Sequence, residues 1–451
     1  MSSMAYRYGV FLDNLDLNRR HWIIFSVCAA GFLFDAADFQ VMALVAPAIA
    51  REWSLDSRSL GLILSSTGVG MLIGSYLFGL IADRIGRRSG FQITIAIVAV
   101  FSGLCGLAQD PTQLAILRFL TGVGIGGFVP IDTAIISEYM PASKRGRLMA
   151  LWALFFPVGG LVAAGAAQFI FPAFGWRGMF IAGVAPAIMV FLVRILIPET
   201  PRFLLDRGRL KEALRSIAWV ANGRALPEAE EVNAAAPNAQ IKRMTVGELF
   251  SPTYRTRTTM LWLVWFGWSF SYFGVLLWLP SLLVQYRGVP GPKVFTFIMG
   301  FLAAGIVGRI LVSFVIDRWG RKKTIAFLGV AAAISLFIFG NSGTYEQLIL
   351  SGYIYAMFHD GGLSAIAPYT PELYPTRARA TGVGWANGAG RIASIVAPIA
   401  VGYVVHLGLE FVFGLLACGF VLATVSVLVL GTETRGMILE EASLEAKAES
   451  P

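Results

Sequence analysis

The feature that most constrains this 451-residue chain is a series of long apolar stretches. Each has about 20 residues, the length that an α-helix needs to cross the hydrocarbon core of a bilayer. Since lipid cannot hydrogen-bond to the backbone, such stretches must cross as helices. Twelve spans are predicted, at roughly 22–49, 59–82, 91–108, 112–137, 147–171, 177–197, 258–286, 293–316, 324–341, 346–369, 381–405 and 409–430.

The charge distribution supports an all-α integral membrane protein. Charged residues make up only 14% of the chain, whereas soluble domains have about 25%. If the N-terminus faces the cytoplasm, only five of the 36 Lys and Arg residues face the other side: Arg51, Arg58, Arg177, Arg287 and Lys293. This asymmetry predicts that both termini are cytoplasmic. The net charge of +9 is therefore a topology signal, and no nucleic-acid partner is expected.

A short charged motif occurs twice. Residues 83–88 read Asp-Arg-Ile-Gly-Arg-Arg, and residues 317–322, 234 positions later, read Asp-Arg-Trp-Gly-Arg-Lys. Each copy follows one apolar run and precedes another, which predicts a tight hairpin between two membrane helices. The repeat predicts two pseudo-symmetric bundles of six helices. Gating is assigned to the motif residues Asp83, Arg84, Arg87, Asp317, Arg318 and Arg321.

The polar middle of the chain divides it into four parts. Residues 1–197 are predicted to form the N-terminal bundle and residues 258–431 the C-terminal bundle. Residues 198–257 between them are expected to be a cytoplasmic linker with a short surface helix near 210–220. Residues 432–451 are expected to be a mobile cytoplasmic tail.

Ionisable residues inside the first half are candidates for proton coupling, because a charge within a span is costly and usually functional. Asp35 and Asp38 are three residues apart, so both carboxylates point to one face of their helix. Two adjacent carboxylates resist joint ionisation, as a proton carrier requires. Arg118, with Asp132 on a similar face, would tune them. The alternatives are that the acids cap or salt-bridge within the bundle and that Arg118 forms a purely structural ion pair.

The second half contains a candidate anion site. Asn387 and Arg391 are one helical turn apart, among the glycines 384, 388 and 390. A guanidinium with open space around it is suited to bidentate binding of a carboxylate. The alternative is that Arg391 pairs with a protein acid such as Asp360. Asp360 and its neighbour His359 are further proton-coupling candidates.

Aromatic residues complete the predicted substrate site. Trp265 and Tyr272 share a stripe on the helix at 258–286, where they either stack on a flat substrate ring or pack in the protein. Trp262 and Trp278, nearer the span ends, are expected to be interfacial belt residues. Phe155 and Gln40 are the remaining substrate-binding candidates.

Enzyme motifs are absent from the sequence. It has no HExxH motif, no Walker-type phosphate loop and no nucleophile elbow. The alternating glycines at 122–127 follow no strand, so they do not indicate a dinucleotide fold. We therefore expect neither an enzyme nor a cofactor or metal site.

Taken together, these motifs resemble the major facilitator superfamily. The repeated hairpin, Arg118 with its glycines, Pro-Glu-Thr-Pro-Arg at 198–202 and Glu-Thr-Arg-Gly at 433–436 carry the resemblance along the whole chain. It implies twelve helices in two halves that rock about a central site. Asp83 and Asp317 are then expected to bond across the interface between the halves in one state and to release in the other.

Further motifs resemble the organic-ion transporter branch, most closely the bacterial niacin permeases. These are residues 369–376, 390–398 and 265–280, while the Asp-Ala-x-Asp of the first helix is also similar to aromatic acid and proton symporters. An arginine at the place of Arg391 implies transport of an organic anion. The resemblance therefore implies proton-coupled uptake of a small aromatic carboxylate such as nicotinate. Asp360 departs from the niacin permeases, which have an uncharged residue there.

The short segment at 50–58 favours a bacterial inner-membrane carrier, which we expect to be monomeric. Three other functions stay open. The chain could be a sugar or polyol symporter, because that branch shares the motif at 198–202, although sugars need several neutral hydrogen-bonding groups. It could be an exporter driven by proton antiport. Outside transport, it could be a transporter-like sensor that binds its ligand without moving it.

Overall fold

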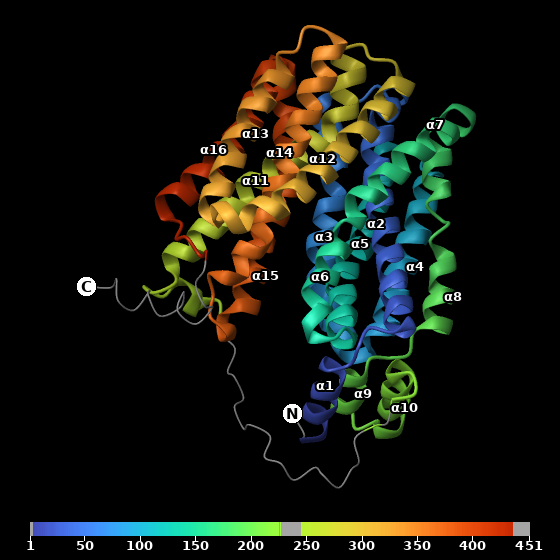
Figure 1. Cartoon of the computed structure of the whole chain (residues 1–451). Coiled ribbons are helices and arrows are strands. Elements are labelled where there is room, and N and C mark those ends of the chain that lie inside the picture. Colours follow the sequence, from blue (N-terminus) through green and yellow to red (C-terminus); the bar gives the residue numbers. More distant parts are fainter. Residues whose placement is uncertain (1–2, 225, 227–244, 436–451) are drawn as a thin grey trace. The chain divides into compact units, whose positions relative to one another are not determined.

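The structure is a computed structural model that describes residues 3–224, 226 and 245–435 (Figure 1). Every regular element in these ranges is a helix, as predicted. The helices of the first half are α1 (Ser3–Asp13), α2 (Arg19–Glu52), α3 (Ser57–Ile85), α4 (Arg87–Cys105), α5 (Pro111–Tyr139), α6 (Ala142–Ala153), α7 (Phe155–Ala182), α8 (Ala187–Leu196), α9 (Pro201–Asp206) and α10 (Leu210–Ala221). Those of the second half are η2 (Gly247–Phe250), α11 (Arg255–Ser281), η3 (Leu282–Tyr286), α12 (Gly291–Trp319), α13 (Arg321–Gly340), α14 (Tyr345–Glu372), α15 (Thr376–Val404), η4 (Val405–Leu407) and α16 (Leu409–Leu430).

The twelve predicted spans are all represented. Among the described residues, ten helical stretches are long and apolar enough to cross a membrane. One of them, Ala142–Val190, contains two crossings, because the backbone turns at Gly175, where φ is 63° and the helix is interrupted. The remaining span is α14, which contains Glu346, His359 and Asp360 and is therefore less apolar. Large apolar side chains such as Phe169 and Phe314 are exposed on these helices, as lipid contact requires.

The described residues fall into two compact units. The first contains residues 3–41, 69–163, 169–224 and 226, and the second contains residues 42–68, 164–168 and 245–435. In the first unit α4 packs on α5 and on α8. In the second, α11 packs on α15 and α16, α12 packs on α14, and α13 packs on α14 and α16.

The helix boundaries repeat at one constant interval. Helices α3, α4, α5 and α6 begin at residues 57, 87, 111 and 142, and α12, α13, α14 and α15 begin at 291, 321, 345 and 376. Each start in the second set lies 234 residues after its counterpart, the same interval that separates the two hairpin motifs. The repeat seen in ten residues of sequence therefore extends to the helix lengths and turns of both halves.

Glycines on α5 allow the close helix contact that the sequence predicts. A Cβ atom added to Gly126 would overlap the backbone of Met71 on α3, and one added to Gly70 would overlap the backbone of Phe119. The two helices therefore approach at backbone distance, as small residues permit in membranes. This close approach positions Arg118, one turn before these glycines, inside the first unit.

Three surface helices gather at one end of the first unit. Helices α1, α9 and α10 contact one another there (Figure 1). The Asn18 side chain donates a 2.8 Å hydrogen bond to the carbonyl of Val220, which joins the start of α2 to α10. The surface helix predicted near 210–220 is thus confirmed as α10. Within the predicted linker, residues 227–244 lie outside the described part of the chain.

Candidate functional site

The first unit contains a buried ion pair between α2 and α5. Arg118 Nη1 lies 2.8 Å from Asp38 Oδ2, and the two side chains are 0% and 2% exposed. The Ser102 hydroxyl on α4 donates a short hydrogen bond to the other carboxylate oxygen of Asp38. Both oxygens of Asp38 are therefore satisfied by α4 and α5. For Asp38, the interpretation as a salt bridge within the bundle is the one that the structure matches.

Asp35, the other acid on this face of α2, has a different environment. It is 3% exposed and interacts electrostatically with Asp38 and Asp132. Its Oδ2 atom has no hydrogen-bond partner within the described ranges. The predicted pair of carboxylates thus divides into one acid held by an arginine and one acid that is available to exchange a proton.

Asp132 on α5 is a third buried acid in this unit. It is 0% exposed, and the Trp152 indole of α6 donates a short hydrogen bond to its Oδ2 atom. The Trp152 ring also stacks on Phe32 of α2, with centroids 4.0 Å apart. The sequence analysis missed Trp152, because nothing in the order of residues indicates that position 152 returns to position 132. The only available signal was a tryptophan close to the polar segment at 142–147.

The two remaining candidates in the first unit lie apart from this ion pair. Gln40 on α2 is buried, and its Nε2 atom has no hydrogen-bond partner in the part of the chain that is described. A buried amide without a partner is suited to a polar ligand. Phe155, at the start of α7, is half-buried and packs edge-on against Phe25, with centroids 6.3 Å apart.

The second unit contains its own buried ion pair, between α12 and α14. Arg309 Nη2 lies 2.6 Å from Asp360 Oδ1, and Arg309 Nε donates to the same oxygen at 2.8 Å. The other oxygen of Asp360 lies 3.3 Å from His359 Nδ1. The alternative in which Asp360 neutralises Arg391 is therefore wrong, because Arg309 and His359 occupy both oxygens of Asp360.

Tyr272 belongs to this cluster. Its ring stacks on the imidazole of His359 with centroids 4.5 Å apart and an angle of 5° between the planes. Trp268 of the same helix donates a 3.0 Å hydrogen bond to the His359 carbonyl. His359 Nε2 and Tyr355 Oη are both buried without a hydrogen-bond partner among the described residues. The structure thus joins Tyr272, predicted to bind substrate, to the predicted proton-coupling pair.

Arg391 lies on α15, where the side chain is half-buried, and Asn387 one turn earlier is exposed. Cβ atoms added to Gly384 and Gly388 would meet no atom of the described chain within 4 Å. The predicted open space around the guanidinium is therefore present. On the other side of α15, Gly390 packs against Trp265 and Ser269 of α11.

Trp265 has a polar anchor that the sequence did not indicate. Its indole donates a 2.9 Å hydrogen bond to Thr370 Oγ1 on α14. Of the two predicted belt residues, Trp262 is half-buried and stacks on the exposed Trp385, with centroids 5.8 Å apart. The prediction for Trp278 is wrong, since this side chain is fully buried and donates a 3.0 Å hydrogen bond to the Pro398 carbonyl.

The hairpin of the first unit is a network of charges. Arg87 pairs with Asp83 at 2.8 Å and with Glu138 of α5 at 3.4 Å. Glu199 Oε1 accepts hydrogen bonds from the backbone N–H groups of Arg87 and Arg88, at 2.9 and 3.1 Å. The carboxylate thus satisfies free donors at the start of α4, where the helix dipole also favours an anion. Arg84 is exposed, and its carbonyl accepts a hydrogen bond from Arg207.

The hairpin of the second unit repeats this network. Arg321 pairs with Asp317 at 2.9 Å and with Glu372 at 3.2 Å, and Arg318 is exposed. Glu433 accepts hydrogen bonds from the backbone N–H groups of Arg321 and Lys322, at 2.8 and 3.2 Å. The expected mobile tail is therefore wrong at its start, because Glu433 is bound to α13; residues 436–451 lie outside the described part.

Gly86 and Gly320 make the two turns, with φ of 100° and 92°, values that side chains rarely adopt. The sequence identified the aspartates, arginines and glycines of these hairpins. It did not identify their acidic partners Glu138, Glu199, Glu372 and Glu433. The contacts described for Asp83 and Asp317 lie within their own units, so the bond across the halves stays a prediction.

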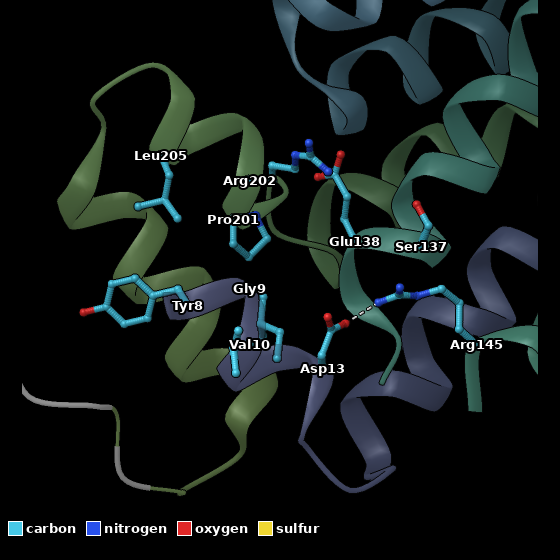
Figure 2. Close-up of a pocket in the computed structure, with 11 residues that line it drawn as sticks. Tyr8, Gly9, Val10, Asp13, Ser137, Glu138, Arg145, Pro201, Arg202 and Leu205 are labelled. Carbon is cyan, nitrogen blue, oxygen red and sulfur yellow. Dashed lines mark hydrogen bonds and ion pairs between the residues drawn. The ribbon is translucent and has the colours of Figure 1, made fainter. Parts of the chain in front are cut away.

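A cavity of about 300 Å³ opens between α1, the end of α5 and α9. Figure 2 shows it with the ion pair between Asp13 and Arg145 on one side. Its lining residues are Tyr8, Gly9, Val10, Leu12, Asp13, Ser137, Glu138, Arg145, Pro201, Arg202 and Leu205. None of the substrate-binding or proton-coupling candidates is among them, so we do not place the transport site here.

Comparison with known proteins gives the same outline. The family described as "Sugar (and other) transporter" matches residues 25–445. The niacin transporter NiaP of Acinetobacter baylyi is 35% identical, over 96% of this chain and 99% of that protein. A gallate transporter of Pseudomonas putida is 30% identical, over 88% of this chain and 89% of the relative. The 4-hydroxybenzoate transporter PcaK of Acinetobacter baylyi is 30% identical, over 85% of each chain.

Solved structures agree on the fold. The xylose transporter XylE from E. coli, in a partially occluded inward-open conformation, superposes with a TM-score of 0.74 at 19% identity, covering 93% of this chain and 100% of that one. The helices, the repeated hairpins and a family match along nearly the whole chain lead to one conclusion. This chain belongs to the sugar (and other) transporter family of the major facilitator superfamily and is a multi-pass membrane transporter, not an enzyme.

Proposed function

We propose that this protein is a secondary active transporter that takes up a small aromatic carboxylate, such as nicotinate, together with protons by alternating access. The observation that carries the substrate class is Arg391, a half-buried guanidinium on a membrane helix whose neighbouring glycines leave open space. A guanidinium offers a carboxylate two parallel hydrogen bonds. Niacin, gallate and 4-hydroxybenzoate, named for the relatives, are all aromatic rings with a carboxylate.

The aromatic ring of the substrate is assigned to Trp265, which lies on the helix that packs beside Arg391. Its indole N–H is already bound to Thr370, so the ring face is what it offers a ligand. Stacking of flat rings contributes about 0.5–1.5 kcal/mol beyond area burial. Asn387 and Gln40 supply amide groups, and Phe155 supplies a second ring.

Proton coupling is assigned to Asp35, with the cluster of Asp360 and His359 as a second titrating region. Asp35 is buried, and one of its oxygens lacks a hydrogen bond within the described ranges. The pair of Asp38 and Arg118 next to it stays ionised and holds α2 against α5. Alternating access is assigned to the duplicated hairpins, whose Asp83 and Asp317 are exposed and able to change partners. Both termini are assigned to the cytoplasm of a bacterial inner membrane.

The substrate assignment is tested with purified protein in proteoliposomes. Wild-type protein is expected to exchange labelled nicotinate in a counterflow assay, which separates a carrier from a sensor. Arg391→Gln is expected to weaken nicotinate binding by about 1.5–3 kcal/mol, roughly 10- to 150-fold, because hydrogen bonds between charged groups are lost. Arg391→Lys keeps the charge without the fork and should be intermediate. Xylose should not compete; competition by xylose, or undiminished nicotinate affinity in Arg391→Gln, would refute the proposal.

A further inference from the structure

We infer that Asp132 is a second proton-binding site, so that each cycle carries two protons with one substrate anion. This inference rests on the proposed function and adds to it the number of protons. Three acids and one arginine meet inside the first unit, namely Asp35, Asp38, Asp132 and Arg118. The inference follows from how their charges can be balanced.

One acid of the cluster is neutralised by protein. Asp38 is bound to Arg118 at 2.8 Å, and this pair has no net charge. Asp35 and Asp132 form no ion pair among the described residues, although they are 3% and 0% exposed. Two uncompensated carboxylates so close together, away from water, would each cost several kcal/mol. Both acids are therefore neutral in this conformation, which means that each carries a proton.

The geometry indicates where the second proton lies. Asp132 Oδ2 already accepts the hydrogen bond of the Trp152 indole. Its Oδ1 atom is buried and has no hydrogen-bond partner in the described ranges. The proton therefore belongs on Oδ1. The titratable groups that interact with Asp132 are Cys28 and Asp35, both on α2. No basic side chain forms an ion pair with it in the described chain.

Release of these protons requires a change in packing around the cluster. Trp152 connects Asp132 on α5 to the aromatic stack of Phe32 on α2. A movement of α6 that withdraws the indole would expose Asp132 to water and let it ionise. Trp152 is accordingly a positioning residue for this proton.

The inference predicts electrogenic transport. Two protons with one monoanion move one positive charge inward, so a membrane potential of 100 mV, negative inside, should raise nicotinate accumulation about 50-fold. Current and labelled uptake would be recorded together in proteoliposomes. Wild-type protein should move one charge per nicotinate, Asp132→Asn should move none, and Asp132→Glu should restore the current. Asp13→Asn, an exposed acid of the same unit, is the matched control and should behave as wild type.

Separate results address the two proposals. If wild-type protein does not accumulate nicotinate under a pH gradient, the proposed function fails. If it accumulates nicotinate without current, or if Asp132→Asn keeps the wild-type charge per nicotinate, only the second proton site fails. Infrared difference spectra provide a readout that does not require transport. A carbonyl band of a protonated carboxyl group, present in wild type, should be lost in Asp132→Asn, and an unchanged band in a folded variant would overturn the inference.

Discussion

The two hairpins of this transporter are copies of each other, whereas the two buried polar clusters are not. At an interval of 234 residues, Asp83, Arg87, Glu138 and Glu199 correspond to Asp317, Arg321, Glu372 and Glu433, and each contact has its counterpart. At the same interval, Asp35, Asp38, Arg118 and Asp132 correspond to Ser269, Tyr272, Gly352 and Ile366. Conversely, Arg391 corresponds to Pro157 and Asp360 to Gly126.

This difference separates two kinds of constraint. The hairpins must do the same mechanical task in each bundle, so their charges and turns are retained. The membrane interior has no such requirement, and the first unit there has an excess of acid while the second presents Arg391. Under the proposed function, one half binds protons and the other binds the anion. Four experiments test this division, beginning with the largest expected effect.

Breaking the ion pair of the first unit should have the largest effect. Arg118→Ala leaves Asp38 as an uncompensated buried charge, so a loss of about 3–5 kcal/mol in the free energy of unfolding is expected. The double variant Asp38→Leu with Arg118→Leu should recover part of it. Thermal unfolding in detergent measures both. Arg309→Ala is the comparison in the second unit and should lose less, because Arg309 is 12% exposed; an equal or larger loss would contradict the distinction.

Removing the free acid of the first unit should affect coupling and leave binding intact. Asp35→Asn is expected to lose about tenfold accumulation per unit of pH gradient, the contribution of one proton. Counterflow, which needs no gradient, should continue. Accumulation and counterflow of labelled nicotinate in the same vesicles measure the two effects. Undiminished accumulation in Asp35→Asn would exclude this residue as the carrier.

Neutralising the hairpin aspartates should slow turnover equally in the two halves. Asp83 and Asp317 are 65% and 74% exposed, so neither ion pair adds more than about 1 kcal/mol to stability. Asp83→Asn and Asp317→Asn should each reduce the transport rate several-fold while the nicotinate affinity changes little. Initial uptake rates and equilibrium binding separate the two quantities. A wild-type rate in either variant would remove that hairpin from the gating mechanism.

The smallest effect is expected for the two helix-capping glutamates. Glu199→Gln and Glu433→Gln keep an acceptor for the backbone N–H groups of α4 and α13 but remove the charge at the helix start. Each should lower the free energy of unfolding by about 0.3–1 kcal/mol, and the two losses should match. Thermal unfolding of the pair of variants is the measurement. A marked difference between them would show that the copied networks are not energetically equivalent.

The sequence was sufficient for the fold, because membrane spans and a repeated motif are local signals. All twelve spans were found, and Gly175 turns the chain inside the predicted gap at 172–176. Composition alone would have missed the span of α14, whose buried His359 and Asp360 lower its hydropathy. The hairpin glycines were likewise evident from the motif.

The sequence was insufficient for the partners of buried charges. Arg309 and Asp360 are 51 residues apart and meet only because α12 packs on α14. Trp152 reaches Asp132 because the helix of one lies beside the helix of the other. Trp278 was misjudged for a similar reason: its distance from the span end suggested an interface, but its indole faces the carbonyl of Pro398 on another helix. Pairings of this kind depend on which helices are neighbours, and the order of residues does not encode that directly.

The constant interval of 234 residues also makes the molecule modular for engineering. A segment taken from one bundle fits the equivalent positions of the other without any insertion or deletion, so residues 83–88 and 317–322 are directly interchangeable in length. Transplanting whole spans in the same way would carry Asp35 or Arg391 into the opposite bundle at a defined depth. The ancestral doubling that such an interval reflects has left a ruler along the chain, on which any substitution in one half names its counterpart in the other.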